Sequence, residues 1–262
     1  MTFTKKLLVI NPNTNKEMTQ VIETSVNQTI SLYKGIISAD TICVDNGVAS
    51  VEGSFDEIVS AYWTLEKVIP LLDQYDGILI ACFSNHASVK ALREYTQKPI
   101  MHIMEAAVLH SLPLGHQFSI ITDSTHWKPL LEEGVSSILG NMEKCASVRS
   151  SGMTALDTVS LSKDIIEQKI VKQSELAIQE DGAEIILLGC AGLSFIQSII
   201  EKKLNIPVVD AVQAGVLFMS GLLLSNAKTS PVGMYTPLPP RPTEVSVPNP
   251  GIMFAYNPKI KK

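Results

Sequence analysis

The chain has 262 residues, of which 45% are hydrophobic and 18% are charged, and its formal net charge at pH 7 is −5. This length allows one large domain or two small ones, and the hydrophobic content excludes a disordered chain. The acidic balance argues against nucleic acid and against a membrane surface as partners, because both attract basic proteins.

No apolar run is long enough to cross a bilayer, and the first residues do not have the features of a signal peptide. Four cysteines are too few for a disulfide scaffold in a chain of this size. We therefore expect a cytoplasmic protein with reduced thiols. The question that follows is whether any of these thiols takes part in chemistry.

Short runs rich in β-branched residues alternate along the chain with longer amphipathic stretches. The short runs predict strands at 6–10, 36–44, 77–82, 99–103, 118–122, 183–188 and 206–209. The amphipathic stretches predict helices at 14–31, 55–72, 87–96, 105–111, 127–139, 161–179, 193–203 and 211–225. Thr14 is expected to cap the first helix, in a capping box with Glu17. The alternation predicts an α/β fold with parallel sheets and right-handed crossovers.

The last stretch, 226–262, differs from the rest because it holds eight of the 14 prolines and has a formal charge of +4. Proline at this density excludes a helix or a central strand. One interpretation is an extended tail over the surface. The other is an arm, anchored by Tyr235, Phe254 or Tyr256, that reaches a neighbouring subunit or covers a cleft.

Two distant segments, 75–85 and 181–192, share one pattern. Each has Asp-Gly, an apolar strand, a small residue, a cysteine, and then small or polar residues that open a helix. The two cysteines, Cys82 and Cys190, are 108 positions apart. This repeat predicts two similar half-domains, each with a cysteine at the carboxyl end of a central parallel strand. Ligands bind at that end in open α/β sheets.

A free cysteine seen alone is more often a small buried packing residue than a reactive group. A packing residue is expected inside a strand, however, and Cys82 and Cys190 both come just before a predicted helix start. Backbone N–H groups at a helix start are expected to lower the pKa of such a thiol. Cys43 and Cys145 have no matching partner, and we interpret both as structural.

Two cysteines that face each other across a cleft suit the inversion of a carbon stereocentre. One group must remove a proton from one face of the carbon, and the other must donate a proton to the opposite face. A thiol pKa of about 8.5 can be tuned toward neutrality, so that one thiol and one thiolate coexist. No histidine, cysteine or carboxylate cluster has zinc-like spacing, and we expect no metal and no other cofactor.

At these residues the chain resembles the aspartate/glutamate racemase superfamily and, within it, the hydantoin and allantoin racemase branch. The resemblance runs over 5–225, and its motifs are INPNT at 10–14, ASVEG at 49–53, ACF at 81–83, GHQFSIIT at 115–122, DGA at 181–183, GCAG at 189–192 and IPVVD at 206–210. The order and spacing of these motifs make the resemblance specific. The Cys-Asn-Thr and Gly-Cys-Thr motifs of the glutamate and aspartate racemase branches are missing from this chain.

The resemblance implies a cofactor-independent racemase of 5-substituted hydantoins, a class of cyclic ureides that includes allantoin and connects to purine and nitrogen catabolism. Cys82 and Cys190 would alternate as base and acid on opposite faces of the ring carbon. The alternatives are an amino-acid racemase, a cysteine-dependent decarboxylase of the same superfamily, or a binding protein on the same fold. A decarboxylase needs only one cysteine as proton donor, and a binding protein needs neither.

The implied architecture is two α/β half-domains of Rossmann-like, three-layer plan with the active site in the cleft between them. We assign 1–100 plus 206–225 to the first half-domain, 101–205 to the second, and 226–262 to the tail. The resemblance also implies a homo-oligomer of unknown number that takes a small-molecule substrate.

Several polar residues beside these motifs are candidates for substrate contacts. The candidates are Asn11, Ser50, Ser84, Asn85 and Thr122, together with the backbone N–H groups of Ala191 and Gly192, which could stabilise an enolate-like oxygen. Each has a plainer interpretation: a turn residue for Asn11, helix capping for Ser84 and Asn85, and a strand-end hydroxyl for Thr122.

The segment after the first cysteine departs from the branch. Many hydantoin racemases have Phe-x-Asp-Pro-Gly there, whereas this chain has Phe-Ser-Asn-His-Ala at 83–87. The pocket wall is therefore expected to differ at this point. His86 could contact the substrate, but we favour a surface histidine at a helix start.

Overall fold

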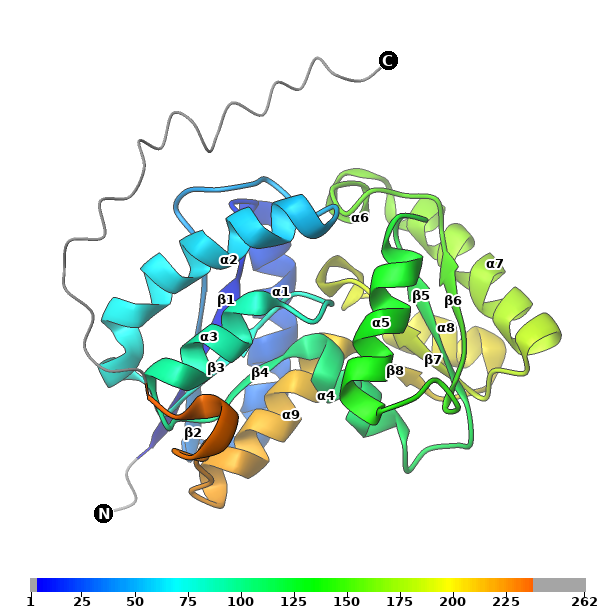
Figure 1. Ribbon diagram of the computed structural model, residues 1–262. Helices are drawn as coiled ribbons and strands as arrows, with labels where there is room; N and C mark the ends of the chain where they lie inside the picture. The colour runs from blue at the N-terminus through cyan, green and yellow to red at the C-terminus, as the bar shows by residue number, and fades with distance from the viewer. Residues whose placement is uncertain (1–3, 238–262) are drawn as a thin grey trace.

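The structure is a computed structural model, and it describes residues 4–237. Two parallel four-stranded sheets form its frame (Figure 1). The first sheet, in the order β2-β1-β3-β4, contains β1 (Lys5–Asn11), β2 (Ile37–Cys43), β3 (Gly77–Ile80) and β4 (Ile100–His102). The second, in the order β6-β5-β7-β8, contains β5 (Phe118–Thr122), β6 (Cys145–Ser150), β7 (Ile185–Leu188) and β8 (Val208–Val209). The second half of the chain therefore repeats the topology of the first.

Helices cover both sheets, and α4 lies between the two halves in Figure 1. The α-helices are α1 (Lys16–Ile30), α2 (Ser54–Val68), α3 (Ala87–Tyr95), α4 (Ile103–Ser111), α5 (Trp127–Leu139), α6 (Asp157–Ser160), α7 (Lys163–Asp181), α8 (Gln197–Leu204) and α9 (Ala211–Leu224). The short 3-10 helices are η1 (Ser31–Tyr33), η2 (Ile69–Gln74), η3 (Ala191–Leu193) and η4 (Gly233–Tyr235). Helix α9 returns the chain to the first half, where it packs against α1, α4 and β3.

The central strands are buried on both faces, because each sheet is a middle layer between helices. In the first sheet, Leu7, Val9 and Leu79 pack on the side of α1 and α9. The alternate residues Leu8, Ile10, Ile78 and Ile80 join a separate cluster with residues of α2, η2 and α3. Strands with continuous apolar runs are typical of parallel sheets covered on both sides. The predicted α/β fold of two similar three-layer halves is confirmed.

The first helix begins one residue later than a Thr14 cap would place it. Asn15 is the N-cap, and its side chain accepts a hydrogen bond from the backbone N–H of Met18 at 2.7 Å. The Thr14 hydroxyl instead donates to the carbonyl of Val48. The predicted capping box was wrong, because Asn13 accepts from the backbone N–H of Asn15 and shifts the turn along the chain.

Two strands differ from expectation. β6 was not predicted, because only Cys145 and Val148 of its six residues are buried and its sequence is largely polar. β8 was predicted, but it pairs with β7 in the second sheet, whereas the expected division placed 206–225 with the first half. The return to the first half begins with α9, and β4 extends the first sheet to His102.

The described part of the proline-rich segment, 226–237, lies against the first half. The backbone N–H of Thr229 donates to the carbonyl of Gln97 at 2.7 Å. Tyr235 packs under the guanidinium of Arg93 and accepts a hydrogen bond from it. Tyr235 is thus an anchor to α3 of its own chain. Phe254 lies outside the described residues, as does the other predicted anchor, Tyr256.

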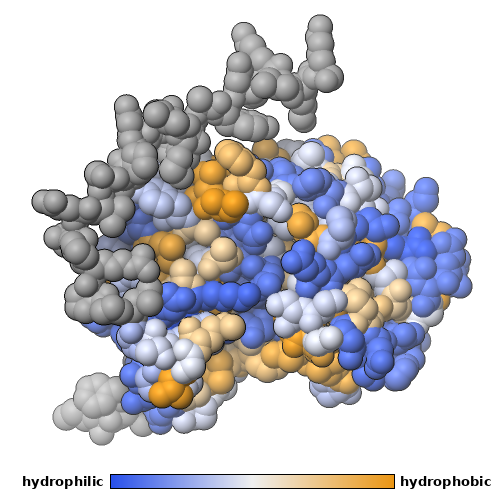
Figure 2. Space-filling view, in the orientation of Figure 1, coloured by the Kyte–Doolittle hydropathy of each residue, from blue (hydrophilic) through white to orange (hydrophobic). Residues whose placement is uncertain are grey.

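The visible surface mixes hydrophilic and hydrophobic residues without one continuous apolar band (Figure 2). Within residues 4–237, no helix combines the length and the apolar character needed to span a membrane.

Candidate active site

The repeat places the two cysteines at equivalent points of the two sheets. Cys82 follows β3 and Cys190 follows β7, each two residues past the last strand residue. The residue before each cysteine makes the same hydrogen bond, because Ala81 N donates to the carbonyl of Ile10 and Gly189 N to the carbonyl of Ile121, both at 2.8 Å. Each cysteine therefore emerges beside the end of the neighbouring central strand.

Both cysteines line one cavity of about 40 Å³ between the two halves. The other lining residues come from both halves, namely Pro12, Asn13, Met18, Val51, Ala81 and Phe83 from the first and Asp123, Trp127, Ala155, Gly189 and Ala191 from the second. All of them are buried except Cys82, which is partly exposed. The structure thus brings Cys82 and Cys190 together in a largely apolar cavity, as the repeat predicts.

Cys190 has a carboxyl group as its immediate neighbour. Asp123 and the backbone of Gly192 lie close enough to the Cys190 thiol to affect its ionisation. Burial, the charge of Asp123 and that of Cys82 raise the pKa of the Cys190 thiol well above its ordinary value, against the opposing effect of Gly192. Burial likewise raises the pKa of Asp123 to about 7, with a further contribution from the charge of Glu52. Asp123 and Cys190 therefore form a buried pair in which ionisation of either group disfavours ionisation of the other.

Cys82 is linked to the carboxyl group of Glu57 through the hydroxyl of Ser84. The Ser84 hydroxyl donates to Glu57 Oε1 at 2.8 Å and lies 3.5 Å from the Cys82 sulfur. Burial raises the pKa of the Cys82 thiol to about 12, and the charges of Glu57 and Asp123 add to this, while Ser84 opposes it. The pKa of Glu57 is also raised by burial.

The expected lowering of the thiol pKa by helix starts was wrong for both cysteines. The first α-helical residue after Cys82 is Ala87, and Cys190 is followed by η3, a single short 3-10 turn. These are weak sources of N-terminal dipole, so the cost of burying a thiolate dominates.

Two positions beside Cys190 require glycine, because a larger side chain would collide with neighbouring elements. A Cβ on Gly189 would lie 3.0 Å from the backbone oxygen of Ile121 and 3.1 Å from the Cα of Thr122. A Cβ on Gly192 would lie 2.1 Å from Thr158 Oγ1. Small residues on both sides of Cys190 therefore allow the close approach of β5 and α6.

Of the predicted substrate contacts, Ala191 lines the cavity and Gly192 faces the Cys190 sulfur. Asn11 and Thr122 lie behind the wall. The Asn11 amide donates to Asn13 Oδ1 at 2.8 Å, and the Thr122 hydroxyl donates to the carbonyl of Gly189 at 3.3 Å. Both residues support neighbours that line the cavity.

Ser50, Ser84 and Asn85 also lie beside the cavity rather than in its wall. Ser50 donates to Glu52 Oε1 at 2.7 Å. The Asn85 amide donates to Ser137 on α5 at 3.3 Å, across the two halves. These polar side chains are hydrogen-bonded to other residues of the chain.

His86 is not a surface residue, and that prediction was wrong. It is 1% exposed, and its ring nitrogens contact the hydroxyls of Ser60 and Ser88. Burial lowers its pKa to about 4. Hydroxyl partners on both ring nitrogens allow a neutral imidazole to be buried without an unpaired polar atom.

Sequence reasoning missed Asn13, Asp123 and Trp127 as cavity residues. A signal for Asp123 was available in the repeat. Ile10 in β1 and Ile121 in β5 hold the same register position in their sheets, so Asn11 corresponds to Thr122. The next residues, Pro12 and Asp123, both line the cavity. One half has proline and the other has aspartate at this position, so the two sequences do not look alike there.

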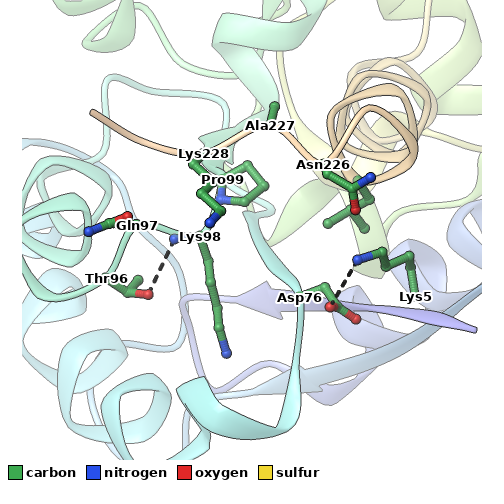
Figure 3. Close-up of a pocket in the computed structure, with 10 residues that line it drawn as sticks. Lys5, Asp76, Thr96, Gln97, Lys98, Pro99, Asn226, Ala227 and Lys228 are labelled. Atoms are coloured by element: carbon green, nitrogen blue, oxygen red, sulfur yellow. Dashed lines mark hydrogen bonds and ion pairs between the residues drawn. The ribbon is translucent and has the colours of Figure 1, made fainter. Parts of the chain in front are cut away.

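Larger hollows lie away from the cysteines. One of about 620 Å³ lies between α1 and the α7–α8 side of the second half. Another of about 290 Å³ lies at the opposite, amino end of the first sheet (Figure 3). There Lys5 pairs with Asp76 at 3.6 Å, and the segment 226–228 forms part of the wall. Within residues 4–237, no group of three or more His, Cys, Asp or Glu could hold a metal ion.

Comparison with known proteins supports the resemblance seen in the motifs. The Asp/Glu/Hydantoin racemase family model matches residues 7–219. A hydantoin racemase of a Pseudomonas species is 33% identical over 88% of this chain and 90% of its own. The structure of an allantoin racemase from Klebsiella pneumoniae superposes with a TM-score of 0.84 at 28% identity, covering 91% of this chain and 95% of that one. An allantoin racemase from Pseudomonas fluorescens gives a TM-score of 0.83 at 31% identity, covering 90% and 98%.

Proposed function

The chain belongs to the Asp/Glu/hydantoin racemase family, and we propose that it is a cofactor-independent racemase of 5-substituted hydantoins, with allantoin as the leading candidate substrate. The observation that carries the proposal is the pair Cys82 and Cys190, placed by equivalent strands of the two halves in one cavity.

In the proposed mechanism, the thiolate of one cysteine takes the proton from the ring carbon, and the C–H electron pair moves into an enolate with the adjacent carbonyl. The thiol of the other cysteine donates its proton to the opposite face, which forms a new C–H bond and leaves a thiolate. Asp123 can accept the proton that Cys190 loses when it ionises and can return it, since the two groups are neighbours in the cavity wall. Ser84 supports the ionised form of Cys82, because its hydrogen bond lowers the pKa of that thiol.

The charge of the cavity wall favours a neutral ring over an amino acid or a malonate. Among the described lining residues, Asp123 is the sole carboxyl group, and none is a lysine or arginine. A substrate carboxylate would therefore be buried beside a carboxyl group without a basic side chain, which is costly. The N–H groups of a ureide ring could instead donate to Asp123 and to the side chain of Asn13.

A substrate panel tests this proposal. Enantiopure allantoin, enantiopure hydantoins with different 5-substituents, amino acids and arylmalonates would be incubated with the purified protein without added cofactor. We expect optical rotation to decay for at least one ureide, with solvent deuterium appearing at the ring carbon. Decay for an amino acid alone, or loss of CO₂ from a malonate, would identify one of the alternative activities. No reaction and no exchange with any ureide would contradict the proposal.

A further inference from the structure

We infer that Glu52 is a latch, a side chain whose hydrogen bond joins the two halves beside the cavity and controls access to Cys82 and Cys190. Glu52 lies in the first half, in the segment ASVEG at 49–53. Its carboxylate accepts the backbone N–H of Ala155, in the second half, with N–O distances of 3.1 and 3.4 Å. For the admission of substrate this inference rests on the proposed function, but access to the thiols can be tested without any substrate.

The hydrogen bond joins two pieces of the cavity wall. Val51, beside Glu52, and Ala155 itself both line the cavity. Ala155 also belongs to a turn that is held together internally, because the Thr158 hydroxyl donates to its carbonyl at 2.7 Å. Release of Glu52 would therefore free the turn from Ala155 to Thr158, rather than one residue.

The Glu52 side chain is held in the position that this bond requires. The Ser50 hydroxyl donates to Glu52 Oε1 at 2.7 Å, and the backbone N–H of Glu52 donates to Asp56 Oδ2 at 3.0 Å. A backbone N–H bonded to a carboxylate is a charge-assisted hydrogen bond, which is stronger than one between neutral groups. The charge of Glu52 also contributes to the raised pKa of Asp123, which indicates that the two carboxyl groups are near each other.

The size of the cavity indicates that its walls must move before a ring can bind. Its 40 Å³ is space for a few water molecules, whereas sites for small organic ligands measure about 300–1,000 Å³. A five-membered ring with a substituent cannot enter while the walls stay as they are. Binding of such a ring therefore requires the walls from the two halves to move apart.

Alkylation of the ligand-free, full-length protein by iodoacetamide tests the latch. The rate at each cysteine would be followed by peptide mass spectrometry, with Cys43 as internal reference because it is partly exposed and does not line the cavity. Two variants distinguish the effect of the length of the side chain at position 52 from the effect of its charge. Glu52→Asp keeps the charge but is one methylene shorter, whereas Glu52→Gln keeps an oxygen acceptor at full reach. Ser137→Ala removes a different hydrogen bond between the halves, the one to Asn85.

We expect Glu52→Asp to speed the alkylation of Cys82 and Cys190 about tenfold or more, with Cys43 unchanged. Glu52→Gln should change the rates no more than about threefold, and Ser137→Ala should leave them as in the unmodified chain. Unchanged rates in Glu52→Asp would overturn the latch. So would a larger increase in Glu52→Gln than in Glu52→Asp, because it indicates an effect of charge, or an increase that includes Cys43, because it indicates a general loosening of the fold. The substrate panel above fails or succeeds independently of these rates.

Discussion

The two halves of the molecule deliver a cysteine by the same topological route but surround it differently. In the second half, Cys190 is buried and lies beside the carboxyl group of Asp123. In the first half, Cys82 is partly exposed and reaches Glu57 through the hydroxyl of Ser84. The repeat therefore reproduces the position of the thiol, and the residues around it set the proton affinity separately in each half.

This difference limits what kinetics can reveal. Because two enantiomers have equal free energies in water, kcat/KM of a racemase must be the same in both directions, in every variant. An asymmetry between Cys82 and Cys190 can appear only in the separate values of kcat and KM or in solvent exchange. The predictions below use these quantities to test the comparison of the two halves.

The largest effect is expected from replacing either thiol. Cys82→Ser and Cys190→Ser should each lose racemisation by about 1,000-fold or more, because a serine hydroxyl is a far weaker acid and base at neutral pH. In D₂O each variant should still exchange the ring proton of one enantiomer with retention of configuration, and the two variants should select opposite enantiomers. Polarimetry and NMR measure the two outcomes. Full racemase activity in both variants would exclude the two-base mechanism.

The next effect is expected at Asp123, where the second half has a direct carboxyl partner. Asp123→Asn should lower kcat about 100-fold, because an amide cannot take up the proton of Cys190. We expect the raised pKa of Asp123 to give the pH profile of the unmodified chain a limb near pH 7, and this limb should disappear in Asp123→Asn. Asp123→Glu should restore part of the activity. Retention of the limb in Asp123→Asn would assign that ionisation to another group.

Much of the fold could be predicted from the sequence, because the decisive signals are local. The apolar runs at 77–82 and 183–188 predicted buried central strands, and the Asp-Gly-strand-cysteine repeat predicted their equivalence. β6 was missed because this half-buried edge strand has no apolar run. The sheet to which β8 belongs depends on long-range pairing, which its few residues do not encode locally.

The site was less predictable, because its polar groups are positioned by partners distant in sequence. The pair Cys82 and Cys190 could be found from the repeat, and their catalytic role stays a prediction. Asp123 belongs to no short motif, and Glu52 meets Ala155 only when both halves are folded. His86 was misplaced because its partner Ser60 comes from another helix. The homo-oligomeric state also stays a prediction.

A smaller effect is expected on stability, with its sign set by the same buried carboxyl group. Burial raises the pKa of Asp123 from 3.8 to about 7, so the folded state binds a proton that the unfolded state has lost between these pH values. The contribution of Asp123 to stability is therefore present below pH 4 and is lost as the pH rises to 7. Asp123→Asn should stabilise the protein by about 1–3 kcal/mol at pH 8 and by less at pH 5. Urea unfolding at the two pH values measures this, and a destabilised variant at pH 8 would contradict it.

The smallest effect is expected in the first half, where the carboxyl group acts through a hydroxyl. Ser84→Ala removes the link between Glu57 and Cys82, and kcat should fall roughly three- to tenfold, the equivalent of one hydrogen bond. Because the Ser84 hydroxyl lowers the pKa of Cys82, its removal should move the alkaline limb of the pH profile upward. Ser111→Ala, at a buried serine hydrogen-bonded within α4, is the matched control and should leave both unchanged. A loss in Ser84→Ala as large as that in Asp123→Asn would show that both thiols depend equally on a carboxyl group, and the difference between the halves would then lie in geometry alone.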